Sequence, residues 1–335
     1  MEKRARTARE EAAMPKVIVF GSMNMDLSID APRVPDAGET LAGSGFITAA
    51  GGKGANQAVA AARLGADVTM VGKVGDDGFG REMTASVAAS GIHTQHILAD
   101  PDHASGVGSI TLEVEEGQKS RNRIIVVPGA NMAITPEEVA FLKEEIAAYD
   151  MVMLQLEIPM EINELVAKYA YEQGVPVMLN SAPSAPLSAE LLSHLSYISP
   201  NEHEAADLTG VEIRKQGKEV NRADVDAAVQ ALLAKGVQNV IITLGSSGAI
   251  VANARESHYC PCIDVVEVKD PTAAGDSFVG AYTTAVCAGL TPAQALEFAS
   301  YAATITVSKM GAQPSLPCLS ETKELMERVA GGQND

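Results

Sequence analysis

The sequence lacks tryptophan, and its tyrosines and phenylalanines make up only 4% of 335 residues. It is also poor in basic residues, because 25 Lys and Arg stand against 43 Asp and Glu, for a formal net charge of −18. Such an acidic chain repels phosphate backbones and anionic lipid, and it offers few aromatic surfaces on which bases could stack. We therefore expect neither a nucleic-acid partner nor a membrane partner.

Long apolar runs and cysteine clusters are missing as well. No uninterrupted apolar run approaches the roughly 20 residues that span a bilayer. Residues 1–14 mix basic and acidic side chains with no hydrophobic segment after them, so they predict an N-terminal extension rather than a signal or transit peptide. Of four cysteines, Cys260 and Cys262 form a C-P-C pair with no second pair nearby, which excludes a four-cysteine zinc site. Idle thiols favour a reducing, cytoplasmic location.

Several familiar catalytic motifs are absent. There is no G-K-[ST] of a P-loop, no G-x-G-x-x-G of a dinucleotide site and no G-x-S-x-G nucleophile turn. His203 and Glu204 begin like a zinc-protease helix, but Asp207 stands where the second histidine is needed. The sequence therefore argues against P-loop nucleotide hydrolysis, Rossmann-type dehydrogenases, zinc proteases and α/β-hydrolases.

What the sequence does have is a regular alternation of strand and helix patterns. Short apolar, β-branched runs at 16–21, 68–71, 150–156, 175–179 and 239–244 alternate with helical patterns at 56–64, 159–173 and 225–235, after Asp276 and after Pro292. Repeated βα units predict an α/β fold with a mostly parallel central sheet and helices on both faces. No repeat or low-complexity linker interrupts the chain, so we expect a single domain over 15–320, followed by a C-terminal helix or tail over 321–335.

Two segments break this alternation. Residues 28–48 contain prolines and glycines without helical periodicity, and residues 106–128 alternate apolar and polar side chains around a turn at Gly117. The second pattern is typical of a hairpin. We expect the two segments to form a small antiparallel β lid, which covers either a substrate or a subunit interface.

The most informative run is Asp270–Ala281, where the small residues Ala273, Ala274 and Gly275 precede a helix that begins near Asp276. A helix start exposes backbone N–H groups that bind anions. Asp276 is then either an ordinary first-turn acid or a base that deprotonates an alcohol beside a transferring phosphoryl group.

Other polar clusters follow predicted strands. Asn24 and Asp26 follow the first strand, Glu157 follows the strand at 150–156, and the run Gly51–Gln57 offers Lys53 and Asn56 beside three glycines. Each cluster alone fits an ordinary turn. Together they favour a ligand crevice at the carboxyl ends of parallel strands.

Six motifs carry a resemblance to a known family: GSMNMDL, GGKGANQA, PNEHEAADLTG, ITLGSSG, DPTAAGDSF and KMGAQPS, at 21–27, 51–58, 200–210, 242–248, 270–278 and 309–315. In their order and spacing, from about residue 16 to about 317, they resemble the ribokinase branch of the PfkB, or ribokinase-like, carbohydrate kinases. The resemblance implies the three-layer ribokinase-like fold and the ATP-dependent phosphorylation of D-ribose at its 5-hydroxyl.

The resemblance also implies residue roles. Asp276 is the general base, beside an anion hole at Ala273, Ala274 and Gly275. The sugar is held by Asn24, Met25, Asp26, Gly52, Lys53, Gly54, Asn56, Glu157 and Asp276. The nucleotide site comprises Asn201, Glu204, Thr243, Leu244, Gly245, Ser246, Ser247, Gly248, Gly275 and Ser300, with Mg²⁺ bound through Asn201, Glu204 and water. Activating K⁺ sits at Asp270, Thr272, Thr306, Lys309, Gly311 and Ser315, several of them through backbone carbonyls, and a homodimer forms through the lid.

Three positions depart from the family pattern: Pro271 replaces Thr beside the cation site, Ser300 replaces Asn beside the adenine, and Ser181 replaces Pro. Two alternatives stay open. One is a kinase of 2-deoxyribose, a fructose derivative, a nucleoside or another sugar on the same fold, and the other is a non-catalytic sugar-binding module.

Overall fold

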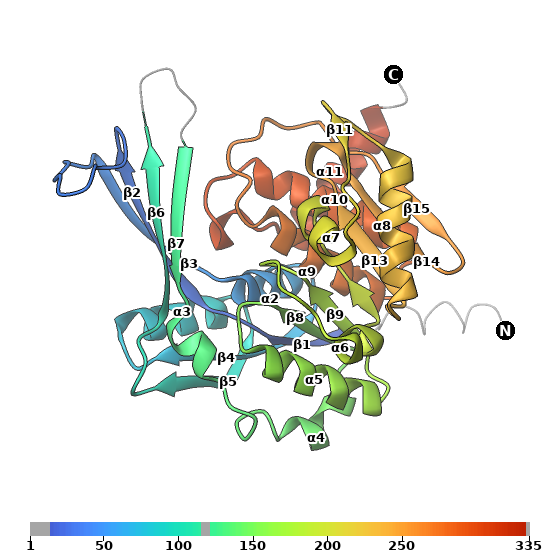
Figure 1. Ribbon diagram of the computed structural model, residues 1–335, viewed down its shortest axis with the longest axis horizontal. Coiled ribbons are helices and arrows are strands. Elements are labelled where there is room, and N and C mark those ends of the chain that lie inside the picture. The colour runs from blue at the N-terminus through green and yellow to red at the C-terminus, as the bar shows by residue number, and fades with distance from the viewer. Residues whose placement is uncertain (1–13, 115–120, 333–335) are drawn as a thin grey trace.

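The structure, a computed structural model, describes residues 14–114 and 121–332 (Figure 1). Within these residues a nine-stranded sheet has the order β15-β14-β13-β10-β9-β8-β1-β4-β5. Its strands are β1 (Lys16–Phe20), β4 (Asp67–Gly75), β5 (His93–Asp100), β8 (Met151–Gln155), β9 (Val177–Asn180), β10 (Tyr197–Ile198), β13 (Asn239–Thr243), β14 (Ala249–Asn253) and β15 (Ser257–Cys260). All neighbours run parallel except β13–β14 and β14–β15 at one edge.

Helices cover both faces of this sheet. Along β1 the side chains alternate, so Val17 and Val19 join one hydrophobic core while Ile18 and Phe20 join the other. The first core contains α2 (Lys53–Arg63), α3 (Gly78–Ala89), α9 (Ala274–Cys287) and α10 (Pro292–Val307), and α11 (Leu319–Gly332) packs on α10. The second contains α4 (Leu142–Glu145), α5 (Met160–Glu172), α6 (Ala189–His194), α7 (Glu202–Thr209) and α8 (Arg222–Ala234). The predicted three-layer α/β architecture is confirmed.

A second sheet has the order β3-β2-β6-β7 and projects from one end of the molecule (Figure 1). It contains β2 (Asn24–Ala31), β3 (Gly45–Gly51), β6 (Gly106–Glu113) and β7 (Arg121–Val127). The pairs β2–β3 and β6–β7 are antiparallel, as expected, but β2 and β6 pair in parallel. The reason is that β2 follows β1 and β6 follows β5. Because β1 and β5 run in the same direction, β2 and β6 both leave the main sheet at the carboxyl ends of its strands.

Short elements complete the described chain: η1 (Gly129–Ala133), η2 (Ile146–Ala148), η3 (Gly245–Ser247), η4 (Gln313–Ser315) and the two-stranded hairpin of β11 (Lys215–Gln216) and β12 (Glu219–Val220). In the part of the chain that the structure describes, no helix combines the length and the hydropathy needed to cross a bilayer. The predicted turn at Gly117 and residues 1–13 of the predicted extension lie outside the described residues.

Several elements extend beyond their predicted bounds. The helix expected from residue 56 begins at Lys53, because Gly52 makes the turn before it with φ of 91°, a conformation that an L side chain rarely adopts. A Cβ at Gly52 would also lie 2.7 Å from the backbone nitrogen of Asn24. The strand β2 begins at Asn24, so Asn24 and Asp26 belong to the second sheet rather than to a turn.

Candidate active site

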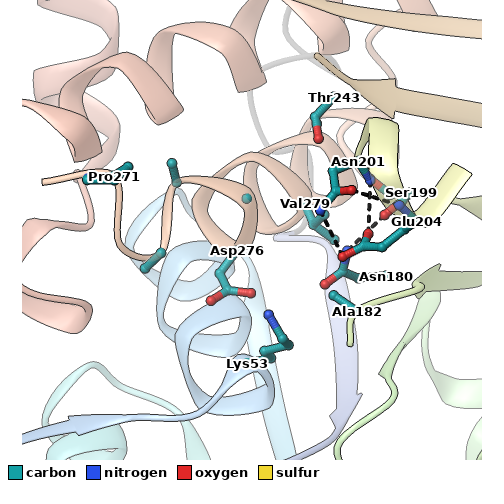
Figure 2. Close-up of a pocket in the computed structure, with 13 residues that line it drawn as sticks. Lys53, Asn180, Ala182, Ser199, Asn201, Glu204, Thr243, Pro271, Asp276 and Val279 are labelled. Carbon is teal, nitrogen blue, oxygen red and sulfur yellow. Dashed lines mark hydrogen bonds between the residues drawn. The ribbon is translucent and has the colours of Figure 1, made fainter. Parts of the chain in front are cut away.

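A pocket of about 230 Å³ opens at the carboxyl ends of the central strands, where the first turn of α9 faces β9, β10 and β13 (Figure 2). Its lining residues come from segments far apart in the sequence: Lys53, Asn180, Ala182, Ser199, Asn201, Glu204, Thr243, Pro271, Ala273, Ala274, Gly275, Asp276 and Val279. Eight of these belong to the predicted site. The pocket is therefore located at the strand ends, as the polar clusters in the sequence indicate.

The first turn of α9 presents backbone N–H groups to this pocket. Ala273 occupies the N-cap position and makes no side-chain cap. The amide of Ala274 donates to the carbonyl of Pro271 at 3.2 Å, whereas within the described residues the amides of Gly275 and Asp276 have no acceptor. Two unpaired amides at the positive end of a 14-residue helix form a site for an anion.

Ala273 adopts φ of 60°, and it is the one non-glycine residue with positive φ in the described chain. For an L-residue this conformation costs roughly 1–2 kcal/mol. This residue directly precedes Ala274, Gly275 and Asp276, all of which line the pocket. Backbone strain of this kind concentrates at functional sites.

Asp276 lies in that turn and is only 7% exposed. Its Oδ2 accepts a hydrogen bond from Asn56 Nδ2 at 2.9 Å, and its Oδ1 accepts one from Gln57 Nε2 at 3.0 Å. Figure 2 shows the Lys53 side chain extending from α2 toward the same carboxylate. Burial raises the pKa of Asp276; Lys53 and the two amide donors oppose this rise, and Glu157 adds to it. The site thus contains a buried carboxylate that is more basic than an ordinary aspartate.

Asn56 and Gln57 reach Asp276 because α2 and α9 touch through a glycine. A Cβ placed on Gly280, one turn after Asp276, would lie 2.7 Å from Ala60 Cβ and 2.9 Å from the carbonyl oxygen of Gln57. Real Cβ atoms do not approach so closely. The hydrogen atom at residue 280 therefore sets the distance between the two helices.

Asp26 lies on β2 at the side of the site nearest the second sheet. Burial, together with the negative charges of Glu157 and Asp276, raises the pKa of Asp26 to about 6. No donor among the described residues hydrogen-bonds its carboxylate, which faces the backbone of Gly51 and Gly108 on the neighbouring strands. A ligand with hydroxyl groups would supply the missing donors.

Asn24 and Glu157 are held in place by neighbours. Asn24 Oδ1 accepts from Asn131 Nδ2 at 2.8 Å, which leaves the Asn24 Nδ2 group to donate elsewhere. Glu157 Oε2 accepts from the backbone amide of Lys53 at 3.1 Å and from the hydroxyl of Ser22. Asn24 on the second sheet and Glu157 after β8 are thus each oriented by hydrogen bonds from neighbouring elements.

Met25 is among the residues predicted to bind the sugar. Its side chain is fully buried in the core, because residues alternate along β2 and Met25 points away from the face that carries Asn24 and Asp26.

Lys53 is the cation of the site: burial lowers its pKa, but the carboxylates of Asp276, Glu157 and Glu204 outweigh that effect and raise it.

The opposite side of the pocket is formed by Asn201 and Glu204 at the start of α7 and by Thr243 at the end of β13. Asn201 caps α7 through its side chain, and the backbone amide of Asn201 donates to Glu204 Oε2 at 2.9 Å. Asn201 also forms a bridge to Thr243. Burial raises the pKa of Glu204, although its hydrogen bond with Asn201 and the charge of Lys53 oppose the rise. Capping therefore fixes this carboxylate where it faces the anion-binding turn.

The remaining predicted nucleotide residues lie in the turn after Thr243 or on α10. Leu244 accepts from the ammonium group of Lys215 at 2.7 Å, and Gly248 packs so closely on β15 that a Cβ would lie 2.1 Å from the carbonyl oxygen of Cys260. Ser300 donates to the carbonyl of Leu296 in its own helix. Leu244–Gly248 and Ser300 do not line the pocket that contains Asp276.

The chain is similar to known proteins. A family model described as pfkB family carbohydrate kinase matches residues 14–319. The chain belongs to the pfkB family of carbohydrate kinases. It is 40% identical over 315 residues to a Ribokinase of Schizosaccharomyces pombe, which covers 92% of this chain and 96% of that protein. It is 39% identical over 313 residues to a Ribokinase of Bacillus subtilis, which covers 93% of this chain and all of that protein.

The fold of this pfkB-family chain also resembles solved structures. Its TM-score with the Arabidopsis thaliana ribokinase complexed with ribose and ATP is 0.84, at 31% identity, covering 93% of this chain and 99% of that one. The predicted family and fold class are therefore confirmed.

Two cations are expected in a kinase of this family, and the residues fit each differently. No group of three or more His, Cys, Asp or Glu side chains that could hold a metal occurs in residues 14–114 and 121–332. A protein cage for Mg²⁺ is thus absent there, but Mg²⁺ commonly binds through one carboxylate, waters and substrate phosphates, which Glu204 at the pocket wall allows.

For K⁺, the relevant observation is that Asp270 joins two loops. Its carboxylate accepts from the amide of Thr272 at 2.9 Å and from the amide of Gly311 at 2.9 Å. Lys309 directs its ammonium group to Glu321 at 2.7 Å, so that only its backbone carbonyl is free for a cation. The hydroxyls of Thr306 and Ser315 donate to the carbonyls of Ala302 and Ala312. Asp270 thus joins Thr272 to Gly311, and the Thr306 hydroxyl lies 2.8 Å from the Ser277 hydroxyl in the first turn of α9.

Several residues near the site were not identified from the sequence, among them four with polar side chains. Gln57 contacts Asp276, Asn131 holds Asn24, and Asn180 and Ser199 line the pocket. Only Gln57 had a sequence signal, because it follows Asn56 in a glycine-rich helix start, and nothing in that signal distinguishes it from a surface glutamine.

Proposed function

We propose that the protein transfers the γ-phosphoryl group of ATP to the 5-hydroxyl of D-ribose and releases ADP and D-ribose 5-phosphate. The observation that carries the proposal is the first turn of α9, where the buried carboxylate of Asp276 stands beside the unpaired amides of Gly275 and Asp276. The similarity to ribokinases supports ribose and ATP as the two substrates.

In this reaction Asp276 accepts the proton of the 5-hydroxyl as the sugar oxygen attacks the γ-phosphorus. The bond between that phosphorus and the oxygen of the ADP leaving group breaks. The amides at the start of α9 stabilise the charge on the transferring group, and the loss of one such oriented donor typically costs about 3 kcal/mol. Base assistance contributes roughly 10²–10⁴-fold.

On the sugar side, Asn24, Asp26, Asn56 and Glu157 are the proposed hydroxyl partners, with Gly52, Lys53 and Gly54 supplying backbone and charge at the start of α2. Asn201, Thr243–Gly248 and Ser300 form the proposed nucleotide side. The position of Lys53, Asn201 and Thr243 in the wall of the pocket that contains Asp276 supports this division.

Mg²⁺ would be held by Glu204, Asn201 and water, and it supplies charge neutralisation of the nucleotide phosphates. K⁺ would be held at Asp270, Thr272, Thr306, Lys309, Gly311 and Ser315. A cation at that place supports the orientation of the anion-binding turn by local electrostatics. Pro271 fixes one backbone angle beside this cation site. We therefore expect K⁺ to raise the activity gradually with its concentration rather than to be strictly required.

The second sheet is the proposed lid and dimer surface. Its strands expose Phe46, Ile47, Ile124, Ile125, Val126 and Val127, each at least half accessible. Such a cluster favours burial against a second copy. The expected cytoplasmic location, where ATP is available, belongs to the same proposal.

A substrate panel tests the function. Purified protein with MgATP, with and without K⁺, is assayed for ADP release on ribose, 2-deoxyribose, fructose derivatives and nucleosides. We expect ribose to give the highest kcat/KM, and Asp276→Asn to lower kcat by at least about 10²-fold while leaving nucleotide affinity nearly unchanged. A higher kcat/KM for another acceptor would reassign the substrate, and ribose binding without turnover would make the protein a sugar-binding module.

A further inference from the structure

A chain of buried amide side chains ends on Asp276. Gln155, the last residue of β8, donates from Nε2 to Gln57 Oε1 at 2.7 Å. Gln57 donates from Nε2 to Asp276 Oδ1 at 3.0 Å and to Asn180 Oδ1 at 3.1 Å. Gln57 and Gln155 have no accessible surface. These glutamines therefore cannot exchange their partners for water.

The direction of this chain is fixed from one end. Asn180 Nδ2 donates to the backbone carbonyl of Ser199 at 2.8 Å, and a carbonyl can only accept. Asn180 must then present its oxygen to Gln57, which meets it with Nε2. The Gln57 oxygen faces Gln155 in turn. Since a primary amide has two hydrogens on nitrogen, the second hydrogen of Gln57 Nε2 is directed at Asp276 Oδ1.

Asn56, the other amide on Asp276, is not fixed in this way. Its Nδ2 donates to Asp276 Oδ2 at 2.9 Å, but its buried Oδ1 has no partner within the described residues. Rotation of the Asn56 amide would place that oxygen opposite Oδ2 without breaking another hydrogen bond. After such a rotation, the Asn56 oxygen can accept the hydrogen that the protonated carboxyl group carries on Oδ2.

We infer that Gln57 is a positioning residue: by donating to Asp276 Oδ1, it keeps that oxygen a permanent hydrogen-bond acceptor. The proton of the sugar hydroxyl that attacks the phosphorus then goes to Oδ2. This inference rests on the proposed role of Asp276 as general base. Gln57 acts through Asp276 and need not touch the substrate. The Gln155–Gln57 hydrogen bond orients Gln57, and Asn56 adapts to the change of charge on Oδ2.

Charged groups around Asp276 set the background for the test. Lys53 of α2 stabilises the ionised form, whereas Glu157 after β8 and Asp26 of β2 carry like charge. Loss of the Gln57 donor removes one interaction that favours the ionised carboxylate. The pKa of Asp276 then rises further, and the acidic limb of the pH profile of kcat/KM moves to higher pH.

The test compares Gln57→Met with Asn163→Met. Asn163 is equally buried and loses a hydrogen bond to the carbonyl of Gln155, but its side chain makes no contact with Asp276. We expect Gln57→Met to lower kcat by about 10- to 100-fold, as loss of a hydrogen bond to a charged group does, with the affinity for a non-hydrolysable ATP analogue unchanged. Its acidic limb moves to higher pH, whereas Asn163→Met keeps the wild-type profile even where its thermal stability falls.

A Gln57→Met protein with wild-type kcat and pH profile would overturn the inference, while leaving the substrate assignment to the panel on the wild-type enzyme. If Gln57→Met does not fold, Gln155→Met provides the test, because it removes the donor that orients Gln57 and leaves the direct bond to Asp276. We then expect the same direction with a smaller loss of kcat. An unchanged kcat and profile in Gln155→Met would equally refute the role of the chain.

Discussion

Asp26→Asn should make the protein more stable and the proposed enzyme worse. The Asp26 carboxylate has a pKa raised from 3.8 to about 6, first by burial and then by the negative charges of Glu157 and Asp276. A carboxyl group whose pKa is raised in the folded state opposes folding wherever it is ionised. An asparagine has nearly the same shape without the charge, so the substitution removes that opposition.

The magnitude follows from the difference between the two pKa values. A shift of one pKa unit corresponds to about 1.4 kcal/mol, so the change in the pKa of Asp26 from 3.8 to about 6 corresponds to about 3 kcal/mol at most. Because Asp26 is only partly buried and solvent screens its charge, we expect a gain of about 1–3 kcal/mol in the free energy of unfolding at pH 7.5. The sign is set by linkage: the cost of the charge is absent below pH 3.8, grows as pH rises and is complete above about pH 6. The gain at pH 5 should therefore be smaller by about 1 kcal/mol.

Urea unfolding at pH 5 and pH 7.5 measures both values. Asp226→Asn, which removes an exposed carboxylate on α8, is the matched control, and we expect it to change the free energy of unfolding by less than about 0.5 kcal/mol. In the same Asp26→Asn protein, the KM for ribose should rise by about 10-fold or more through loss of a charged hydrogen-bond acceptor. Equal or lower stability at pH 7.5, or a gain that does not change with pH, would show that the Asp26 charge is not under strain in the unliganded site.

Substitutions at three further positions test the geometry. Gly280→Ala should separate α2 from α9, lowering the free energy of unfolding by about 1–3 kcal/mol and lowering kcat as well; a thermal melt and steady-state kinetics measure the two, and an unchanged kcat would separate helix spacing from catalysis. Ala273→Gly, at φ of 60°, should keep kcat within about threefold without loss of stability, whereas Ala273→Val should lose more than about 1 kcal/mol in urea unfolding. Asn131→Leu should raise the KM for ribose more than the KM for ATP, because it frees the Asn24 amide to rotate; equal changes in both would remove Asn131 from the sugar side.

The parts of this fold that could be predicted from the sequence are those whose signal lies within a few residues. β1 and β8 are buried on both faces, so each reads as a continuous apolar run. The start of α9 was likewise identifiable, because three small residues precede an acid at the beginning of an apolar helix. The prediction of a small sheet succeeded for the same local reason, since alternation over 106–128 specifies a hairpin.

What the sequence did not predict depends on residues far apart in the chain. Gln57 and Asp276 are 219 positions apart, and they meet only because Gly280 lets two helices touch. Asn131 and Asn24 are 107 positions apart. The parallel pairing of β2 with β6 arises because both strands leave the main sheet at the carboxyl ends of its strands. Neither sequence alone specifies this pairing. For Met25, the motif alone does not show which way the side chain points, whereas alternation along β2 directs it away from Asn24 and Asp26.

The charges of the site tie these observations together. Asp26, Glu157, Glu204 and Asp276 influence one another or Lys53, the single cation that lines the described pocket. Burial raises the pKa of three of these carboxylates, so the unliganded site spends folding free energy to keep them close. On the proposed assignment, the hydroxyl groups of the sugar would donate to Asp26, and a cation beside the phosphates would bind at Glu204. Binding of both ligands would therefore offset the cost of burying Asp26 and Glu204, while Asp276, held by Asn56 and Gln57, remains the proposed base.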